Sequence, residues 1–144
     1  MRAVVTRVTE ASVSIAGETA GRIGRGLLVL LGVGPADTGD TAARMARKIC
    51  TLRVFEDEGG RMNRDLAAVG GGLLVVSQFT LYADTRSRRP GFSGAAGPEL
   101  AQPLYERFLE ECRLQGFPPE RGRFGADMQV ASVNDGPVTL WLEL

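Results

Sequence analysis

The SQFTL segment, residues 77–81, carries the first group of side chains that could do chemistry. It continues an apolar run, and a strand from Leu73 to Tyr82 would place Gln78 and Thr80 on a face that begins apolar. A buried glutamine amide costs about 2 kcal/mol or more unless its hydrogen bonds are made. Either the strand leaves the core here and its polar side chains face water, or it forms the floor of a site whose donors and hydroxyl are aimed at a ligand carbonyl.

A second unusual segment is VNDGPVT, residues 133–139. Its central Asp-Gly pair predicts a hairpin turn that joins a strand over residues 128–133 to another over 138–142. Pro137 is unexpected at the start of a strand, because proline cannot donate a backbone hydrogen bond to the sheet. The Gly136–Pro137 peptide can also adopt the cis form. By itself this segment predicts only a turn with special geometry.

The composition removes much of the usual catalytic chemistry. The 144 residues include no histidine, which excludes Ser-His-Asp and Cys-His nucleophile pairs, histidine metal ligands and the common proton shuttle near neutral pH. Cys50 and Cys112 match no zinc-binding spacing and fall within helical patterns, so we predict that both are reduced core residues. An enzyme with this sequence must work without the commonest catalytic side chain.

Charge and hydropathy limit the partners that the chain can have. Its 17 Lys and Arg residues balance 17 Asp and Glu residues, so any contact with RNA needs a local basic cluster. Arg86, Arg88 and Arg89, in a loop predicted over residues 85–97, form the best candidate. The N-terminal residues lack a signal-peptide pattern and no apolar run reaches about 18 residues, so we expect a cytoplasmic protein without membrane contact.

The elements that would position these segments are strands and two amphipathic helices. Period-two alternation predicts strands with one polar face near the N-terminus, and a fully apolar run predicts a central strand covered on both sides. The predicted strands cover residues 2–8, 12–15, 19–23, 27–33, 73–82, 128–133 and 138–142, and the predicted helices cover 37–53 and 98–115. We therefore predict one α+β domain over residues 1–144, a mostly antiparallel sheet or partial barrel with two packed helices.

Together the two unusual segments resemble those of a known family. SQFTL at residues 77–81 and NDGPVT at 134–139 are similar to the signature motifs SQFTL and NxGPVT of the D-aminoacyl-tRNA deacylases. Further similarity follows in the family's order: MRAVVTRVTEASVSI, LLVLLGV, FEDEGGRMN, LYADTRSRRPGFSGAA and GRFGADMQV. Thr6 departs from the pattern, since family members often carry Gln there. The resemblance covers essentially the whole chain.

The resemblance implies a hydrolase that cleaves the ester joining a D-amino acid, or glycine, to the terminal ribose of tRNA. It implies a homodimer in which a cis Gly136–Pro137 loop of one subunit enters the pocket of the other. There the loop would hold the α-amino group and block the side-chain direction of an L-amino acid. No metal and no cofactor are implied, because the 2′-hydroxyl of the RNA would assist the attacking water.

The same resemblance implies roles for individual residues. Backbone N–H groups around Gln78 and Phe79 would form an oxyanion hole, and Phe79 could stack near the terminal base. The Ser77 and Thr80 hydroxyls would orient the adenosine or the ester, and Arg7 would hold the Gly-Pro loop in place. The implied catalytic residues are Ser77, Gln78, Phe79 and Thr80; those for substrate binding and chiral selection are Gly136, Pro137, Asn134, Arg7 and Met128; those for tRNA binding are Arg86, Arg88 and Arg89.

Several alternatives stand beside this interpretation. Thr80 could act as a covalent nucleophile, although no histidine and no nearby lysine would accept its proton. Without the resemblance, Arg7 would be interpreted as an ordinary solvent-facing strand arginine. The chain could also be a non-catalytic RNA-binding module that holds tRNA ends, or an editing deacylase with a different chirality preference and a trans Gly-Pro peptide.

Overall fold

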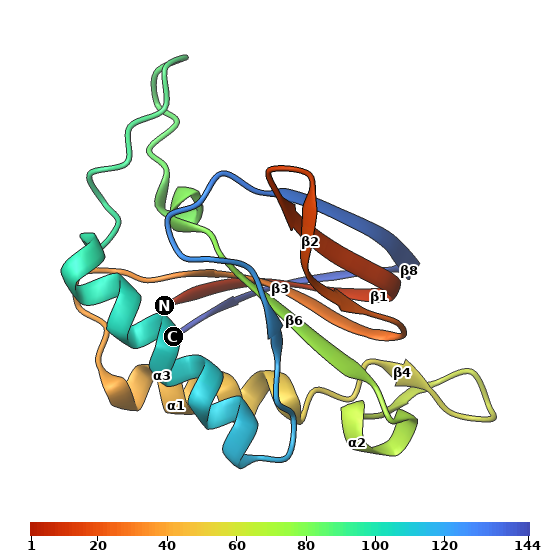
Figure 1. The fold of residues 1–144 in the computed structure, drawn as a ribbon. Helices are drawn as coiled ribbons and strands as arrows, with labels where there is room; N and C mark the ends of the chain where they lie inside the picture. Colours follow the sequence, from red (N-terminus) through yellow and green to blue (C-terminus); the bar gives the residue numbers. More distant parts are fainter.

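The computed structural model describes residues 1–144 and is organised around one long strand, β1 (Arg2–Ile15) (Figure 1). One edge of β1 pairs antiparallel with β2 (Glu18–Ile23) and β3 (Gly26–Gly32). Its other edge pairs antiparallel with β8 (Gln129–Glu143) along nearly its full length. The two predicted N-terminal strands are therefore one continuous strand, and the predicted hairpin into β2 is confirmed.

The remaining strands extend the sheet in parallel. β3 pairs with β6 (Gly72–Ser77), and β6 pairs with the short β7 (Glu120–Arg121). A separate two-stranded sheet consists of β4 (Phe55–Glu56) and β5 (Met62–Arg64). The predicted α+β class is confirmed. The sheet is mixed because the connections from β3 to β6 and from β6 to β7 contain helices, and each connection brings the next strand back parallel to β3.

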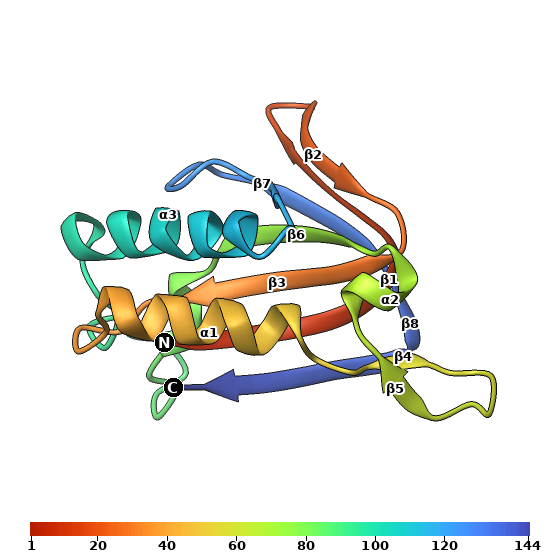
Figure 2. The same ribbon diagram turned by 90° about the horizontal axis from the view of Figure 1, so that it is seen from below.

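Two helices cover one face of the sheet and lie side by side, α1 (Gly39–Cys50) and α3 (Pro98–Leu114) (Figure 2). Thr38 caps the start of α1, and Pro98 occupies the first turn of α3, where its missing N–H costs nothing. A short helix that the sequence pattern did not predict, α2 (Leu66–Val69), precedes β6. No helix is long and apolar enough to cross a membrane.

The core has two layers because β3 and β6 are buried on both faces. Side chains on one face pack under α1 and α3, and those on the other face form a smaller cluster with β1 and β2. The first layer includes Leu27, Val29, Leu31, Leu73 and Val75, and the second includes Leu28, Leu74 and Val76. The prediction that the LLVLLGV strand is covered on both sides is confirmed.

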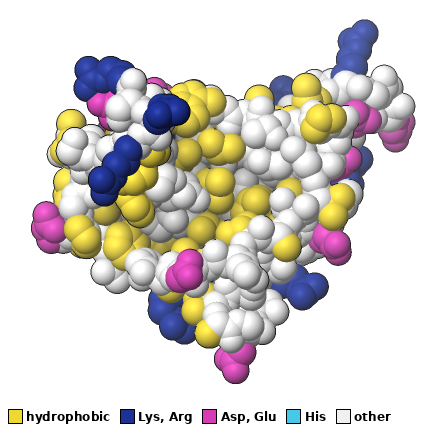
Figure 3. Space-filling view, turned by 90° about the horizontal axis from the view of Figure 1, so that it is seen from above, with side chains coloured by type: hydrophobic (Ala, Val, Ile, Leu, Met, Phe, Trp, Pro, Cys, Tyr) yellow, Lys and Arg dark blue, Asp and Glu magenta, His cyan; other side chains and the backbone are white.

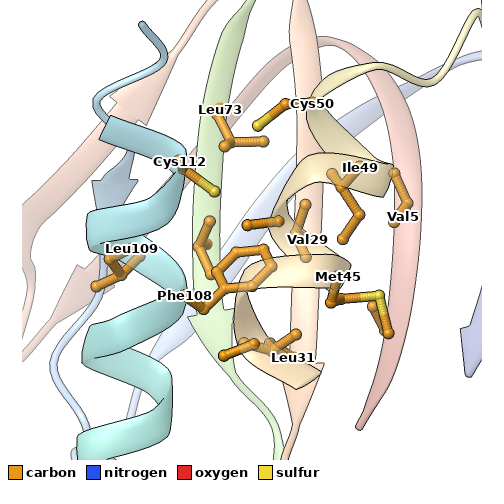
Figure 4. Packing of buried hydrophobic residues seen from close by; sticks show 14 of the residues in the cluster. Val5, Val29, Leu31, Met45, Ile49, Cys50, Leu73, Phe108, Leu109 and Cys112 are labelled. Atoms are coloured by element: carbon orange, nitrogen blue, oxygen red, sulfur yellow. The ribbon is translucent and has the colours of Figure 1, made fainter. Parts of the chain in front are cut away.

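Both cysteines are buried between the helices and the sheet. Cys50 at the end of α1 and Cys112 in α3 point toward the same region around Leu73 of β6 (Figure 4). Neither forms a disulfide. The prediction of reduced core cysteines is confirmed.

The strand predicted over residues 73–82 is too long. β6 ends at Ser77, and residues Phe79–Tyr82 form a 3₁₀ helix, η1. Tyr82 of η1 packs on Gly34, which follows β3, so closely that a Cβ there would lie 2.7 Å from the tyrosine hydroxyl. The chain turns to make this contact, so Gln78 and Thr80 do not continue the face of a strand.

The predicted hairpin at the NDGPVT segment is also wrong. Both flanking arms belong to β8 and pair with β1, with Thr139 opposite Thr6 and Asn134 opposite Val8. The residues between them oppose Arg7 alone, so the segment is a large bulge within one strand. We call it the Gly-Pro bulge, residues 134–138.

Candidate active site

A cavity of about 590 Å³ opens where β6 ends. Three segments enclose it: the end of β6 with the start of η1, the loop that leads into α3, and the segment that leads into β8. Figure 3 shows hydrophobic side chains lining a hollow on this side of the molecule, with Lys and Arg side chains at its edge. The lining includes Val33, Val76, Ser77, Gln78, Phe79, Phe92, Ala95, Ala96, Gly97, Pro98, Phe124, Ala126, Asp127 and Met128.

The change from strand to 3₁₀ helix leaves backbone donors at this cavity. The Gln78 N–H donates to the Leu31 carbonyl at 2.8 Å as a last link to β3, so it is not free for a ligand. The N–H groups of Phe79 and Thr80 begin η1 and have no acceptor within that helix. Because Phe79 lines the cavity and Thr80 does not, the Phe79 N–H is the backbone donor that this turn offers a ligand, and the Gln78 N–H is not one.

The side chains of Gln78 and Thr80 bind each other. The Gln78 amide donates to the Thr80 hydroxyl oxygen, and both side chains are half-buried. Thr80 does not line the cavity. An amide N–H cannot accept a proton, so this contact orients the Thr80 hydroxyl and does not activate it.

The far end of η1 is fixed by a residue that sequence reasoning did not single out. Arg2 donates to the Leu81 carbonyl at 3.0 Å, and its guanidinium lies 4.2 Å from the centroid of the Tyr82 ring. Burial raises the pKa of Tyr82 to about 12, and the nearby Asp37 carboxylate acts in the same direction. The phenol is therefore neutral at physiological pH, and η1 is held at both ends.

Arg7 holds the Gly-Pro bulge from beneath and is buried, 5% exposed, which corrects the interpretation of a solvent-facing arginine. It donates to the Asp135 carbonyl at 3.0 Å and to the Val54 carbonyl at 2.6 Å, and its Nε lies 3.4 Å from an Asp135 carboxylate oxygen. A Cβ on Gly136 would lie 2.6 Å from Arg7, and φ at Gly136 is +122°. Only glycine fits this position without strain.

Asn134 stabilises the Gly-Pro bulge through two hydrogen bonds of its side chain. Its amide donates to the Thr139 hydroxyl at 3.0 Å and its carbonyl oxygen accepts the Val138 N–H at 3.2 Å. The Gly136–Pro137 peptide is cis. Both residues are exposed, so the bulge presents its backbone at the surface of β8.

The structure separates the predicted site residues into two places. It brings Ser77, Gln78, Phe79 and Met128 together around the cavity. Arg7 and the Gly-Pro bulge do not line this cavity, and Thr80 stands behind it. Within one chain, the predicted catalytic and chiral-selection residues therefore do not form a single site.

The predicted tRNA-binding arginines lie on the exposed loop beside the cavity. Arg86 is paired with Asp84, and this hydrogen bond holds the pKa of the Asp84 carboxyl below its usual range. Arg88 and Arg89 make no salt bridge. The loop therefore carries two cations that no carboxylate of the chain neutralises.

No sequence motif predicted a role for two phenylalanines that line the cavity. Phe92 and Phe124 both line it. Each lies in a segment with family resemblance, but neither belongs to a signature motif. Their position depends on how the loop before α3 and the segment before β8 meet over β6, which is a tertiary property that local patterns do not carry.

Comparison with known proteins places this geometry in a family. The model of the family described as D-Tyr-tRNA(Tyr) deacylase matches residues 4–143. The chain belongs to this deacylase family. A D-aminoacyl-tRNA deacylase of Chlorobaculum tepidum is 62% identical over 99% of this chain and 97% of its own length. The D-aminoacyl-tRNA deacylase of Proteus mirabilis is 52% identical over the full length of both. As a member of the deacylase family, the chain is a hydrolase.

Solved structures agree with the deacylase fold. The structure titled c-Myc DNA Unwinding Element Binding Protein matches with a TM-score of 0.94 and 46% identity, covering 100% of this chain and 99% of that one. A probable eukaryotic D-amino acid tRNA deacylase matches with a TM-score of 0.85 over 99% of this chain and 98% of that one. The latter is 15% identical and therefore shows the fold alone.

Proposed function

We propose that the chain hydrolyses the ester of D-aminoacyl-tRNA, and that of glycyl-tRNA, releasing the free amino acid and tRNA. The observation that carries this proposal is the cavity at the end of β6, with the Phe79 N–H at the start of η1, in a chain related to D-aminoacyl-tRNA deacylases. Its volume of about 590 Å³ lies within the range of pockets that bury one small ligand. That ligand is the aminoacyl group with its terminal nucleoside.

The proposed chemistry needs position and hydrogen-bond donors from the protein. Water adds to the ester carbonyl carbon, the bond to the ribose oxygen breaks, and the proton of the water passes to that leaving oxygen. The Phe79 N–H stabilises the oxyanion, while the 2′-hydroxyl of the ribose assists the water. Ser77 and Gln78 orient the ester. No step requires a histidine, a metal or a cofactor.

The alternative in which Thr80 is the nucleophile predicts a different outcome from mutation. Thr80 stands behind the cavity, and its hydroxyl faces an amide that cannot take a proton. Thr80→Ala should therefore lower kcat by about 10-fold, because Gln78 loses its partner while the backbone donors remain. Abolished turnover with intact substrate binding would favour the covalent route instead.

For chiral selection, we propose that the Gly-Pro bulge acts in the cavity of a second copy of the chain. The bulge is exposed, it lies outside the cavity of its own chain, and β8 pairs only with β1, so its outer edge is free. Val133 and Trp141 on the same strand are 49% and 52% exposed, which favours burial against another copy. An inserted backbone would exclude L side chains by steric clash and accept glycine, which has none.

For tRNA binding, we propose that Arg88 and Arg89 contact phosphates near the acceptor end. Neither cation is in a salt bridge, and both lie in the exposed loop that leads to Phe92 of the cavity. Because the net charge is zero, this loop provides the local electrostatic attraction that the surface as a whole lacks. We place the reaction in the cytoplasm, where aminoacyl-tRNA is used.

A second candidate is a nucleic-acid-binding module without catalysis. It is favoured by the high similarity to a structure whose title names DNA binding, at 46% identity. Such a module would bind tRNA ends without releasing amino acids. Ester loss therefore distinguishes the two functions.

The test is to incubate D-Tyr-tRNA, L-Tyr-tRNA and Gly-tRNA separately with the protein and to follow the ester with time. We expect rapid loss from D-Tyr-tRNA and Gly-tRNA, and L-Tyr-tRNA that stays charged. Equal rates for D- and L-Tyr-tRNA would contradict chiral selection, and binding without any hydrolysis would support the non-catalytic module.

A further inference from the structure

Two phenylalanines form an exposed aromatic pair at the rim of the cavity. Phe79 is 54% exposed and Phe92 is 40% exposed, and both line the cavity. Their ring centroids lie 5.2 Å apart at an angle of 75°, an edge-to-face contact. The two rings are not stacked face to face, and both side chains keep a large exposed fraction. Exposed aromatic faces at the mouth of a ligand cavity indicate contact with a ligand.

Phe92 is held in place by the surrounding backbone. Asp84 and Gly91 exchange two hydrogen bonds of 2.8 and 2.9 Å, which close the loop next to the ring. On the other side, the Phe92 carbonyl accepts the Ala95 N–H at 3.1 Å, and the Ala96 N–H donates to Val33 of the core at 3.0 Å. The backbone that carries the ring is therefore preorganised, so a ligand that contacts the ring has less disorder to remove.

The loop that carries Phe92 also carries the unpaired cations. Arg88 and Arg89 precede Phe92 by only a few residues, and neither is in a salt bridge. An aromatic face beside exposed guanidinium groups is the combination that binds single-stranded nucleic acid, with the base on the ring and the phosphate near the cation. The ligand that fits this surface is a nucleotide.

The volume of the cavity indicates which nucleotide of the tRNA lies against Phe92. With about 590 Å³, it holds the aminoacyl group and its terminal nucleoside. The preceding nucleotide must then lie outside, at the rim where Phe92 stands. We infer that Phe92 stacks on the nucleobase of the penultimate nucleotide of the tRNA; this inference rests on the proposed function. Because every base has a flat face, such stacking requires no base-specific hydrogen bond.

The experiment compares two small substrates that differ only in this base. One is the D-tyrosyl ester of a cytidine–adenosine dinucleotide, and the other has an abasic ribose in place of the cytidine. With the wild-type protein, we expect KM for the abasic substrate to be about 5- to 100-fold higher, with kcat unchanged. Phe92→Ala should show the same high KM on both substrates, and Phe92→Tyr should retain the preference.

The control variant is Met62→Ala, because Met62 is 53% exposed and lies in β5, away from the cavity. It should retain the wild-type preference. If Phe92→Ala raises KM equally on both substrates and keeps the preference, the ring packs the cavity and does not stack on the base. If Phe92→Ala changes neither KM, the inference is wrong.

A parallel binding measurement separates this inference from the proposed function. The probes are the same two dinucleotides with an amide in place of the ester, and the readout is Kd by calorimetry. If the wild-type protein hydrolyses neither ester, the proposed function fails. A Kd that depends on the base in the wild-type protein but not in Phe92→Ala would still support stacking, and a Kd independent of the base would overturn it.

Discussion

The SQFTL segment and the Gly-Pro bulge differ in how the fold holds them. The SQFTL segment follows a buried strand, is tied to β3 through the Leu31 carbonyl, and lines a cavity of its own chain. The Gly-Pro bulge lies on a strand with a free outer edge and lines no part of that cavity, although buried Arg7 fixes its shape. This difference favours our proposal that the first segment works within its own chain, whereas the second acts on another.

Gly136→Ala, in the Gly-Pro bulge, should have the largest effect on hydrolysis. The new Cβ would lie 2.6 Å from Arg7 at a φ of +122°, so the bulge must change shape. We expect kcat/KM for D-Tyr-tRNA to fall by about 100-fold or more, because a displaced bulge no longer positions the α-amino group. Steady-state hydrolysis assays give this number.

Gly17→Ala is the matched control for Gly136→Ala. Gly17 also has a positive φ, +82°, but a Cβ there meets nothing within 4 Å. It should cost about 1 kcal/mol of stability and leave hydrolysis unchanged. Unchanged hydrolysis in Gly136→Ala itself would contradict the role of the bulge.

Arg7→Met tests whether the bulge is held from beneath. The substitution leaves the Val54 and Asp135 carbonyls without their donor, so the free energy of unfolding should fall by about 3 kcal/mol, measured by urea denaturation. D-selective hydrolysis should fall with it at temperatures where the variant stays folded. Arg22→Ala, at an exposed arginine of β2, should change stability by less than about 0.5 kcal/mol. Equal effects of the two variants would show that Arg7 does not support the bulge.

Arg2→Ala tests the SQFTL segment, because Arg2 contacts the far end of the 3₁₀ helix η1. Loss of the hydrogen bond to the Leu81 carbonyl and of the contact with Tyr82 should let η1 move. We expect kcat to fall by about 10-fold with KM nearly unchanged, because the N–H donors matter most in the transition state. Arg2→Lys keeps a cation over the ring and should recover part of the rate. A change in KM alone would indicate that Arg2 contacts the tRNA instead.

The smallest effect concerns the arginine loop beside the first segment. Replacing both Arg88 and Arg89 with Ala should weaken tRNA binding and reduce the slope of log K against log salt by about 1.5. Replacing Arg86, which Asp84 already neutralises, should reduce the slope less. Equal slopes for all variants would remove this loop from the tRNA interface.

Much of the fold was predictable because its main elements carry strong local patterns. The covered strand of β3, the amphipathic helix with Thr38 at its start and the helix that begins at Pro98 were all found in place. The end of β6 was not predictable, since the residues after it favour a strand and the contact between Tyr82 of η1 and Gly34, which follows β3, is not part of the local pattern.

The residues of the candidate site could be predicted from the sequence, but their arrangement in space could not. The Asp-Gly pair is typical of a hairpin, and the bulge that forms instead depends on Arg7, 128 residues away from Asp135 in the sequence. The cavity wall formed by Phe92 and Phe124 likewise depends on contacts between distant segments. Resemblance to a family supplied the signature residues, and the structure showed that one chain keeps the two motifs apart.

We propose that one working site combines the cavity of one chain with the Gly-Pro bulge of another. Its most direct test is complementation between two damaged chains: Gly136→Ala, with an intact cavity, and Ala126→Trp, which fills the cavity but leaves the bulge intact. Each variant alone should be inactive on D-Tyr-tRNA. Co-expressed in equal amounts, they should recover about a quarter of wild-type activity, because half of the dimers are mixed and one of their two sites is intact. A mixture that forms mixed dimers yet stays inactive would contradict a site shared between two chains.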